Sequence, residues 1–186
     1  MVVADVSGHG IASALMMTAF RGMLRMHTHG KLGEAKIART LNRLLPEFTG
    51  GSHFITAFYV VLNLKNGNIS YVCCGHPPAL LLHPNDHITL LNNHRPALGI
   101  FNNIKYATEN ISMDHGDILV MYTDGVVEVT SSNGEQFGIE RFKRTLITNL
   151  HLPTAALIQM IIQTIQKFSV NHDFSDDFTL VIIKKE

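Results

Sequence analysis

The chain opens with Val2-Val3-Ala4-Asp5-Val6-Ser7-Gly8-His9-Gly10, in which an apolar strand runs into a tight glycine turn. The residues from Val2 to Val6 are typical of a buried strand, and the glycines allow the backbone to reverse. Apolar residues then recur at helical spacing, which predicts a helix over about residues 11–27. A second helix begins near residue 35 and is expected to stop near Pro46, because proline lacks the N–H that continues a helix.

Beyond these helices the apolar period changes to that of strands, and Asn66-Gly67 is a strong hairpin signal. The expected strands are residues 54–64, 69–73, 79–82, 88–91, 106–111, 118–122 and 178–183. Two further helices, around residues 142–147 and 155–168, precede the last strand. This order predicts an α+β fold, a layered α-β-β-α sandwich with two mainly antiparallel sheets flanked by helix pairs.

Length and charge restrict the class of protein. A chain of 186 residues fits one domain, and 46% hydrophobic residues supply a sizeable core. Fifteen Lys and Arg balance fifteen Asp and Glu, so nothing suggests a nucleic-acid or anionic-membrane partner. No apolar run approaches the ~18 residues of a membrane span, so no membrane insertion is expected. Cys73 and Cys74 are sequence neighbours and make no disulfide framework, which favours a reducing cytoplasm.

The buried-strand pattern already begins at Val2, with no segment before it. Natural domains seldom begin in the middle of a strand. We therefore expect residues 1–186 to be a single domain that is truncated at its N-terminus.

Acidic residues stand at the ends of three predicted core strands. Asp5 precedes the glycine turn, Asp124 follows the strand at 118–122, and Asp176 and Asp177 precede the last strand. Carboxylates beside apolar runs are costly unless they are paired, hydrogen-bonded or bound to metal. Hard oxygen ligands of this kind suit Mg²⁺ or Mn²⁺. Aspartates at strand ends also act as turn formers or helix caps, so both interpretations stay open.

A pair of such ions about 3.5–4 Å apart can deprotonate a bridging water and orient it for in-line attack on phosphorus. This mechanism needs no side-chain nucleophile, which agrees with a sequence that offers no convincing Ser-His-Asp or Cys-His arrangement. The nucleotide-binding loop Gly-x-x-x-x-Gly-Lys-Ser/Thr is also missing from the sequence, which argues against a kinase or GTPase.

The order and wording of several motifs point to one family. The main motifs are Asp5-Val6-Ser7-Gly8-His9-Gly10, Cys74-Gly75-His76-Pro77-Pro78, Tyr122-Thr123-Asp124-Gly125-Val126-Val127-Glu128 and Asp176-Asp177-Phe178-Thr179-Leu180. The lesser ones are Phe54-Ile55-Thr56-Ala57, Leu98-Gly99 and Glu135-Gln136-Phe137-Gly138. In this order they resemble the bacterial branch of the metal-dependent protein phosphatases (PPM, protein phosphatase type 2C-like). The match is to its stage II sporulation protein E and RsbU-like group, and it covers nearly the whole chain.

The resemblance implies a ligand set for two Mn²⁺ or Mg²⁺ ions. Asp5 would bridge the ions, and the carbonyl of Val6 would complete one shell. Asp124 and Asp176 would hold the second ion, with Asp177 as the alternative to Asp176. Two departures stand against the family pattern: the upstream Gly-Gly-Asp-Tyr/Phe-Tyr-Asp-like hairpin is missing, and Cys73-Cys74 stands where the group often has Asn-Ala.

The resemblance also implies the reaction: hydrolysis of phosphoserine or phosphothreonine by metal-activated water. The substrate would be a phosphorylated regulatory protein of the anti-anti-sigma type, in partner-switching control of a sigma factor. An upstream sensory module would regulate the enzyme in the full-length protein. The alternative is a catalytically impaired scaffold, or regulatory binding module, with the phosphatase fold.

Histidines are the remaining candidates. His9 could donate a proton to the leaving group, but a turn histidine with satisfied hydrogen bonds is the competing interpretation. His76 is interpreted in the same way, because Pro77-Pro78 indicates a structural turn. His27 and His29 could bind zinc, although no Cys or carboxylate partner accompanies them.

Overall fold

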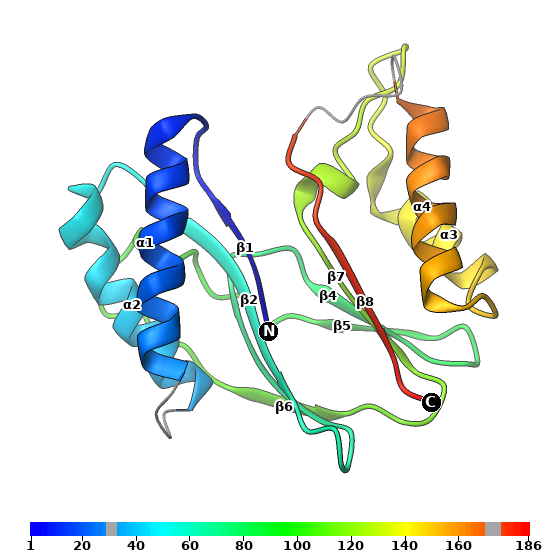
Figure 1. The fold of residues 1–186 in the computed structure, drawn as a ribbon, viewed down its shortest axis with the longest axis horizontal. Coiled ribbons are helices and arrows are strands. Elements are labelled where there is room, and N and C mark those ends of the chain that lie inside the picture. The colour runs from blue at the N-terminus through cyan, green and yellow to red at the C-terminus, as the bar shows by residue number, and fades with distance from the viewer. Residues whose placement is uncertain (29–32, 170–175) are drawn as a thin grey trace. The chain divides into compact units, whose positions relative to one another are not determined.

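The computed structural model describes residues 1–28, 33–169 and 176–186, and in it the chain divides into two units. Unit 1 comprises Met1–Pro78 and Leu91–Ser112, and unit 2 comprises Ala79–Leu90 and Met113–Glu186. Each unit contains one four-stranded sheet and one pair of helices (Figure 1).

The sheet of unit 1 is antiparallel and has the order β1-β2-β3-β6. Its strands are β1 (Val2–Val6), β2 (Ile55–Leu62), β3 (Asn68–Cys74) and β6 (Glu109–Ser112). Strands β2 and β3 form the hairpin that Asn66-Gly67 predicts, and Gly67 takes a φ of 77°, which glycine adopts without strain. In the register of β1 against β2, Asp5 lies opposite Thr56 and Val6 lies opposite Ile55.

The helices of unit 1 are α1 (Ile11–Thr28) and α2 (Glu34–Thr49), which lie side by side in Figure 1. Helix α2 is amphipathic, and its apolar face contacts β3 and β2. The buried core between these elements includes Val6, Met16, Phe20, Ile37, Leu41, Leu45, Ile55, Val72 and Tyr106. Of the methionines on α1, Met16 belongs to this core, whereas Met26 is exposed.

The sheet of unit 2 is antiparallel where β4, β7 and β8 pair, and its order is β5-β4-β7-β8. Its strands are β4 (Ala79–Leu82), β5 (Ile88–Leu91), β7 (Ile118–Tyr122) and β8 (Leu180–Lys184). A 3₁₀ turn, η1 (Asp124–Val126), follows β7 and leads toward helices α3 (Gly138–Thr148) and α4 (Thr154–Phe168). The core of this unit includes Leu80, Val120, Tyr122, Val126, Phe137, Phe142, Leu146, Leu157, Ile161 and Ile165.

The predicted α+β class, with two antiparallel sheets and two helix pairs, is confirmed. Two predicted boundaries are wrong by three residues, and several others differ by one or two. Helix α2 passes through Pro46 and ends at Thr49, since a proline in the last turn removes only one helical hydrogen bond. Strand β6 begins at Glu109, not at residue 106, where the Tyr106 hydroxyl instead donates to the carbonyl of Pro96 at 3.0 Å. That residues 1–186 make one truncated domain stays a prediction.

None of the helices described is both long and apolar enough to cross a membrane.

A buried asparagine fastens α2 to the loop that precedes β6. The side chain of Asn42 is 4% exposed. Its amide donates to the carbonyl of Phe101 at 3.0 Å, and its oxygen accepts from the N–H of Gly99 at 2.9 Å. The Tyr106 hydroxyl donates to the same oxygen at 3.4 Å. One polar side chain therefore binds two backbone groups and one hydroxyl group of a loop far away in sequence.

We predict that Asn42→Ala lowers the free energy of unfolding by about 1–3 kcal/mol, because the N–H of Gly99 and the carbonyl of Phe101 lose their hydrogen bonds to this buried side chain. Denaturant unfolding measures this difference. The matched control is Asn102→Ala, an exposed position in the same loop, which should change stability by less than about 0.5 kcal/mol. Equal effects of the two substitutions would contradict the role given to Asn42.

Candidate metal-binding site

Asp5 lies near the end of β1, one residue before the last residue of the strand, and is partly buried. Val6 lies opposite Ile55 in the pairing of β1 with β2, but the N–H of Ile55 donates to the carbonyl of Leu98 at 3.0 Å. A carbonyl oxygen has two lone pairs, so the Val6 carbonyl has the capacity to bind a cation. The strand end thus presents a carboxylate and a carbonyl next to each other in sequence.

The turn after β1 brings the chain into helix α1. Gly8 and Gly10 both have a φ of 86°, which only glycine adopts freely. The Ser7 hydroxyl accepts from the N–H of Phe54 at 2.9 Å, and the N–H of Ser7 donates to the Phe54 carbonyl at 3.0 Å. These bonds fix the start of the turn against the residue before β2. His9 lies between the glycines and is exposed, so its proposed part in proton transfer stays a prediction.

In unit 2, Asp124 opens the 3₁₀ turn η1 directly after β7 and Thr123. Its carbonyl accepts from the N–H groups of Val127 and Glu128, at 2.8 and 2.9 Å. One carboxylate oxygen accepts from the N–H of Gly125 at 3.1 Å. The backbone around Asp124 is therefore fixed locally, while the second carboxylate oxygen remains for another ligand.

Thr123 ties the Asp124 turn to the segment that carries Asp176 and Asp177. Its side chain is 3% exposed, and its hydroxyl donates to the carbonyl of Asp177 at 2.9 Å. The same hydroxyl accepts from the N–H of Thr179 at 3.0 Å, and the N–H of Thr123 donates to the Thr179 carbonyl at 3.1 Å. These bonds extend the pairing of β7 and β8 to the predicted ligands of unit 2.

Gly125 permits the closest approach in this contact. A Cβ atom at this position would lie 2.5 Å from the carbonyl oxygen of Asp177, closer than real Cβ atoms come. Gly125 has no positive φ, so a larger residue is excluded by space and not by backbone conformation. The structure therefore brings together the segments of Asp124 and Asp176 within unit 2.

The structure does not decide between Asp176 and Asp177. Both side chains are exposed. One carboxylate oxygen of Asp176 accepts from the N–H of Asp177 at 2.7 Å. The Thr123 hydroxyl holds the backbone carbonyl of Asp177, not its side chain. The preference for Asp176 stays a prediction.

The chemistry of the donors fits Mg²⁺ or Mn²⁺. Carboxylate and carbonyl oxygens are the hard ligands that these ions prefer. Over the described ranges, no Lys, Arg or His forms an ion pair with Asp124 or Asp176. Within the same ranges no three His, Cys, Asp or Glu side chains form a group that could hold a metal ion. The predicted ligands are divided between the two units, so each unit supplies only part of the predicted set.

Two other candidates are structural. His76 is 5% exposed, and its Nδ1 is 2.9 Å from the hydroxyl of Thr56, a contact that fits a turn histidine with satisfied hydrogen bonds. Cys73 and Cys74 are free, buried thiols, as expected. Burial raises the pKa of Cys73 to about 11 and raises that of Cys74 further, so neither is a thiolate nucleophile at neutral pH. Of the proposed zinc pair, His29 lies outside the described residues.

Tyr122 ends β7 just before the candidate ligands. Burial raises the pKa of its phenol to about 12, so it stays neutral. Its ring packs edge-on against Phe142 with centroids 5.0 Å apart. Tyr122 is therefore part of the support of the site and not a nucleophile.

Sequence reasoning missed the role of Thr123, although this residue lies within a quoted motif. A threonine beside a strand-end aspartate has no periodic signal of its own. Strands β7 and β8 are far apart in sequence. Only their pairing shows that the Thr123 hydroxyl joins the Asp124 turn to the segment that contains Asp177.

We predict that Gly125→Ala lowers the free energy of unfolding by about 1–3 kcal/mol, because the added methyl group overlaps the carbonyl of Asp177. Urea unfolding measures the change. Gly22→Ala is the matched control: Gly22 lies inside α1 with open space around it, so alanine should stabilise the helix by about 0.5–1 kcal/mol. A neutral or stabilising Gly125→Ala would show that the two segments are not in contact.

Comparison with known proteins agrees with the family resemblance of the sequence motifs. The sequence profile of the family described as Stage II sporulation protein E (SpoIIE) matches residues 1–186. The phosphoserine phosphatase RsbP of Bacillus subtilis (strain 168) is 29% identical over 190 residues, which cover 99% of this chain and 45% of RsbP. The phosphoserine phosphatase RsbU of the same organism is 26% identical over 189 residues, which cover 100% of this chain and 55% of RsbU.

Among solved structures, the SiaA-PP2C domain of Pseudomonas aeruginosa superposes with a TM-score of 0.85. The match covers 100% of this chain and 75% of that chain, at 18% sequence identity, and at this identity it shows the fold alone. The chain spans about half the length of RsbP and RsbU, so these comparisons do not assign the activity of either complete protein to it. Because the family profile covers every residue from 1 to 186, the chain belongs to the stage II sporulation protein E family.

Proposed function

We propose that this chain is the catalytic part of a metal-dependent phosphatase that hydrolyses phosphoserine or phosphothreonine on a protein. The observation that carries the proposal is the fixed contact between the Asp124 turn and the segment of Asp176 and Asp177, which Thr123 and Gly125 maintain. Two relatives that match nearly the whole chain are named as phosphoserine phosphatases, which supports the same reaction.

Asp5, the Val6 carbonyl, Asp124 and Asp176 are the ligands that we propose. When bound, two Mn²⁺ or Mg²⁺ ions would supply an activated water and neutralise charge on the phosphate. The protein's part is to hold these oxygens in place. In unit 1 the paired β1 and the Ser7–Phe54 bonds do so, and in unit 2 the Thr123 hydroxyl does so.

Rigid support of this kind matters because catalysis depends on the orientation of the reacting groups. A displacement of about 1 Å can cost a hundredfold in rate. Asp124 follows β7, whose five residues are all buried, after one intervening residue, Thr123. His9 stands in the exposed turn after β1, and we propose it as a proton donor to the leaving group only as a secondary role.

The substrate we propose is a phosphorylated regulatory protein of the anti-anti-sigma type in a partner-switching system. An upstream sensory module would control the enzyme, and the cytoplasm would be its compartment. Membership in the stage II sporulation protein E family and similarity to RsbP and RsbU support this assignment, and so do the neutral net charge and the free, buried cysteines.

We predict that the chain hydrolyses p-nitrophenyl phosphate and a phosphoserine peptide only when Mn²⁺ or Mg²⁺ is added. Asp124→Asn should lower turnover at least about a hundredfold, because it removes a charged metal ligand. A steady-state assay across a Mn²⁺ titration measures this. Asp86→Asn is the matched control, since Asp86 lies exposed in a turn with a φ of 65° that asparagine also adopts.

Normal turnover by Asp124→Asn would overturn the metal assignment. A lack of turnover in the unsubstituted chain with either metal would favour the scaffold alternative. The same assay compares Asp176→Asn with Asp177→Asn, and the larger loss identifies the ligand of the pair.

A further inference from the structure

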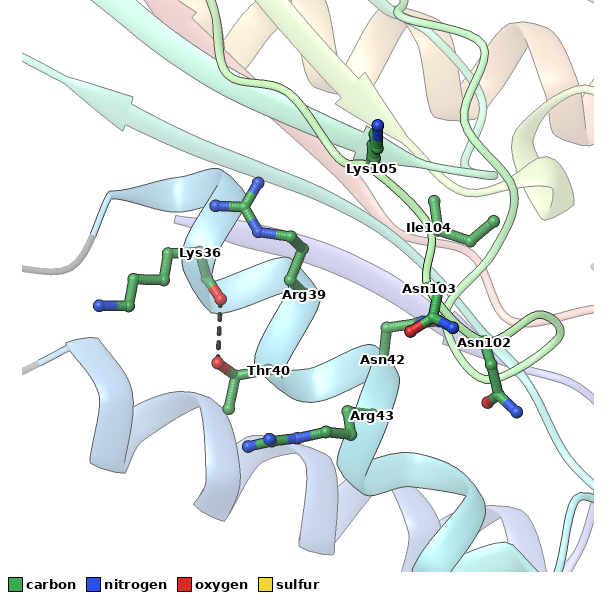
Figure 2. A pocket seen from close by; sticks show the side chains of 9 residues that line it. All are labelled: Lys36, Arg39, Thr40, Asn42, Arg43, Asn102, Asn103, Ile104 and Lys105. Atoms are coloured by element: carbon green, nitrogen blue, oxygen red, sulfur yellow. Dashed lines mark hydrogen bonds between the residues drawn. The ribbon is translucent and has the colours of Figure 1, made fainter.

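A hollow of about 800 Å³ lies in unit 1 between helix α2 and the loop before β6 (Figure 2). Its lining residues are Lys36, Arg39, Thr40, Asn42, Arg43, Asn102, Asn103, Ile104 and Lys105. We name this surface the basic groove. None of its residues is among the proposed metal ligands.

Positive charge is concentrated in the basic groove. Lys36, Arg39 and Arg43 follow one another at intervals of three and four residues, which places them along one side of α2. At a rise of 1.5 Å per residue, this row extends over about 10 Å. Lys105 adds a fourth cation from the loop. The whole chain has no net charge, so this is a local feature and not a general basicity.

Within residues 1–28, 33–169 and 176–186, no carboxylate pairs with the row or with Lys105. The nearest acidic residue that precedes the row on α2 is Glu34, whose carboxylate accepts from the hydroxyls of Ser70 at 2.7 Å and Thr108 at 3.4 Å. All four cations are exposed and therefore accessible to a partner.

Hydrogen bonds between α2 and the loop hold the two sides of the basic groove in place. The Arg39 guanidinium donates to the carbonyl of Tyr106 at 2.8 Å, which joins α2 to the loop. Asn42, buried below, holds the carbonyl of Phe101 and the N–H of Gly99. The two walls are thus fixed relative to each other, while Lys36 and Arg43 keep their charged ends for a ligand.

We propose that the basic groove binds an acidic segment of a protein partner. A row of cations about 10 Å long matches several consecutive carboxylates better than one phosphate group. Asn102 and Asn103 add amide donors, and Ile104 adds an apolar side chain. Among the lining residues that the structure describes there is no aromatic ring on which a nucleobase could stack, which disfavours a nucleotide. The inference concerns binding alone and goes beyond the proposed hydrolysis.

Fluorescence anisotropy tests the proposal with the 186-residue chain and a labelled ten-residue peptide that contains six Glu and Asp. We expect saturable binding that weakens as salt rises, because the contacts are exposed ion pairs. The variant Lys36→Gln/Arg43→Gln should bind the peptide about three- to tenfold more weakly. Arg39 is left unchanged, because its bond to Tyr106 supports the loop.

The matched control is Lys65→Gln/Lys167→Gln, which removes the same charge from two exposed lysines outside the groove. It should bind as the unsubstituted chain does, and circular dichroism should show that both double variants are folded. Equal peptide affinity in the two double variants, or no binding by the folded chain, would overturn the proposal. So would tripolyphosphate that binds at least as tightly as the peptide and displaces it, since this would assign the groove to a small polyanion. Phosphatase activity does not enter these measurements, so a failure here leaves the proposed function untouched.

Discussion

The contact between the Asp124 turn and the carbonyl of Asp177 is the constraint on which the candidate chemistry depends. It requires a glycine at position 125, where a Cβ atom would lie 2.5 Å from that carbonyl oxygen. It also requires the buried hydroxyl of Thr123, which both donates to Asp177 and accepts from Thr179. These two residues join the turn after β7 to the segment before β8, beyond the five paired residues of the strands themselves.

The same local arrangement supports a carboxylate in each unit. A strand buried in a sheet ends, a short turn follows, and hydroxyl groups bind the backbone of a neighbouring segment. In unit 1 the hydroxyl belongs to Ser7, and in unit 2 it belongs to Thr123. Asp5 and Asp124 then extend from or just beyond strand ends, which favours precise placement of these two ligands.

Much of the fold could be predicted because its signals are local. The strand at Val2–Val6, the Asn66-Gly67 hairpin and the strand at Ile118–Tyr122 follow from apolar period and turn chemistry. The boundaries that failed depend on tertiary contacts. Helix α2 continues past Pro46, and the segment at Tyr106 is held by hydrogen bonds to the carbonyls of Pro96 and Ala97 in place of strand pairing.

For the candidate site, the sequence identified the acidic residues but not what holds them. Motif order pointed to Asp124 and Asp176, whereas the bridging role of Thr123 required the pairing of β7 with β8. The basic groove was not predicted either, because Lys105 and the row on α2 are more than sixty positions apart in the chain. Such features arise only when distant segments meet.

The most direct test of the central claim is calorimetric titration of Mn²⁺ into the unsubstituted chain, Asp5→Asn and Asp124→Asn. The account predicts that both substitutions weaken Mn²⁺ binding at least about tenfold, since each removes a charged ligand. Asp86→Asn should bind Mn²⁺ as the unsubstituted chain does. Unchanged Mn²⁺ affinity in Asp5→Asn and Asp124→Asn would contradict the account.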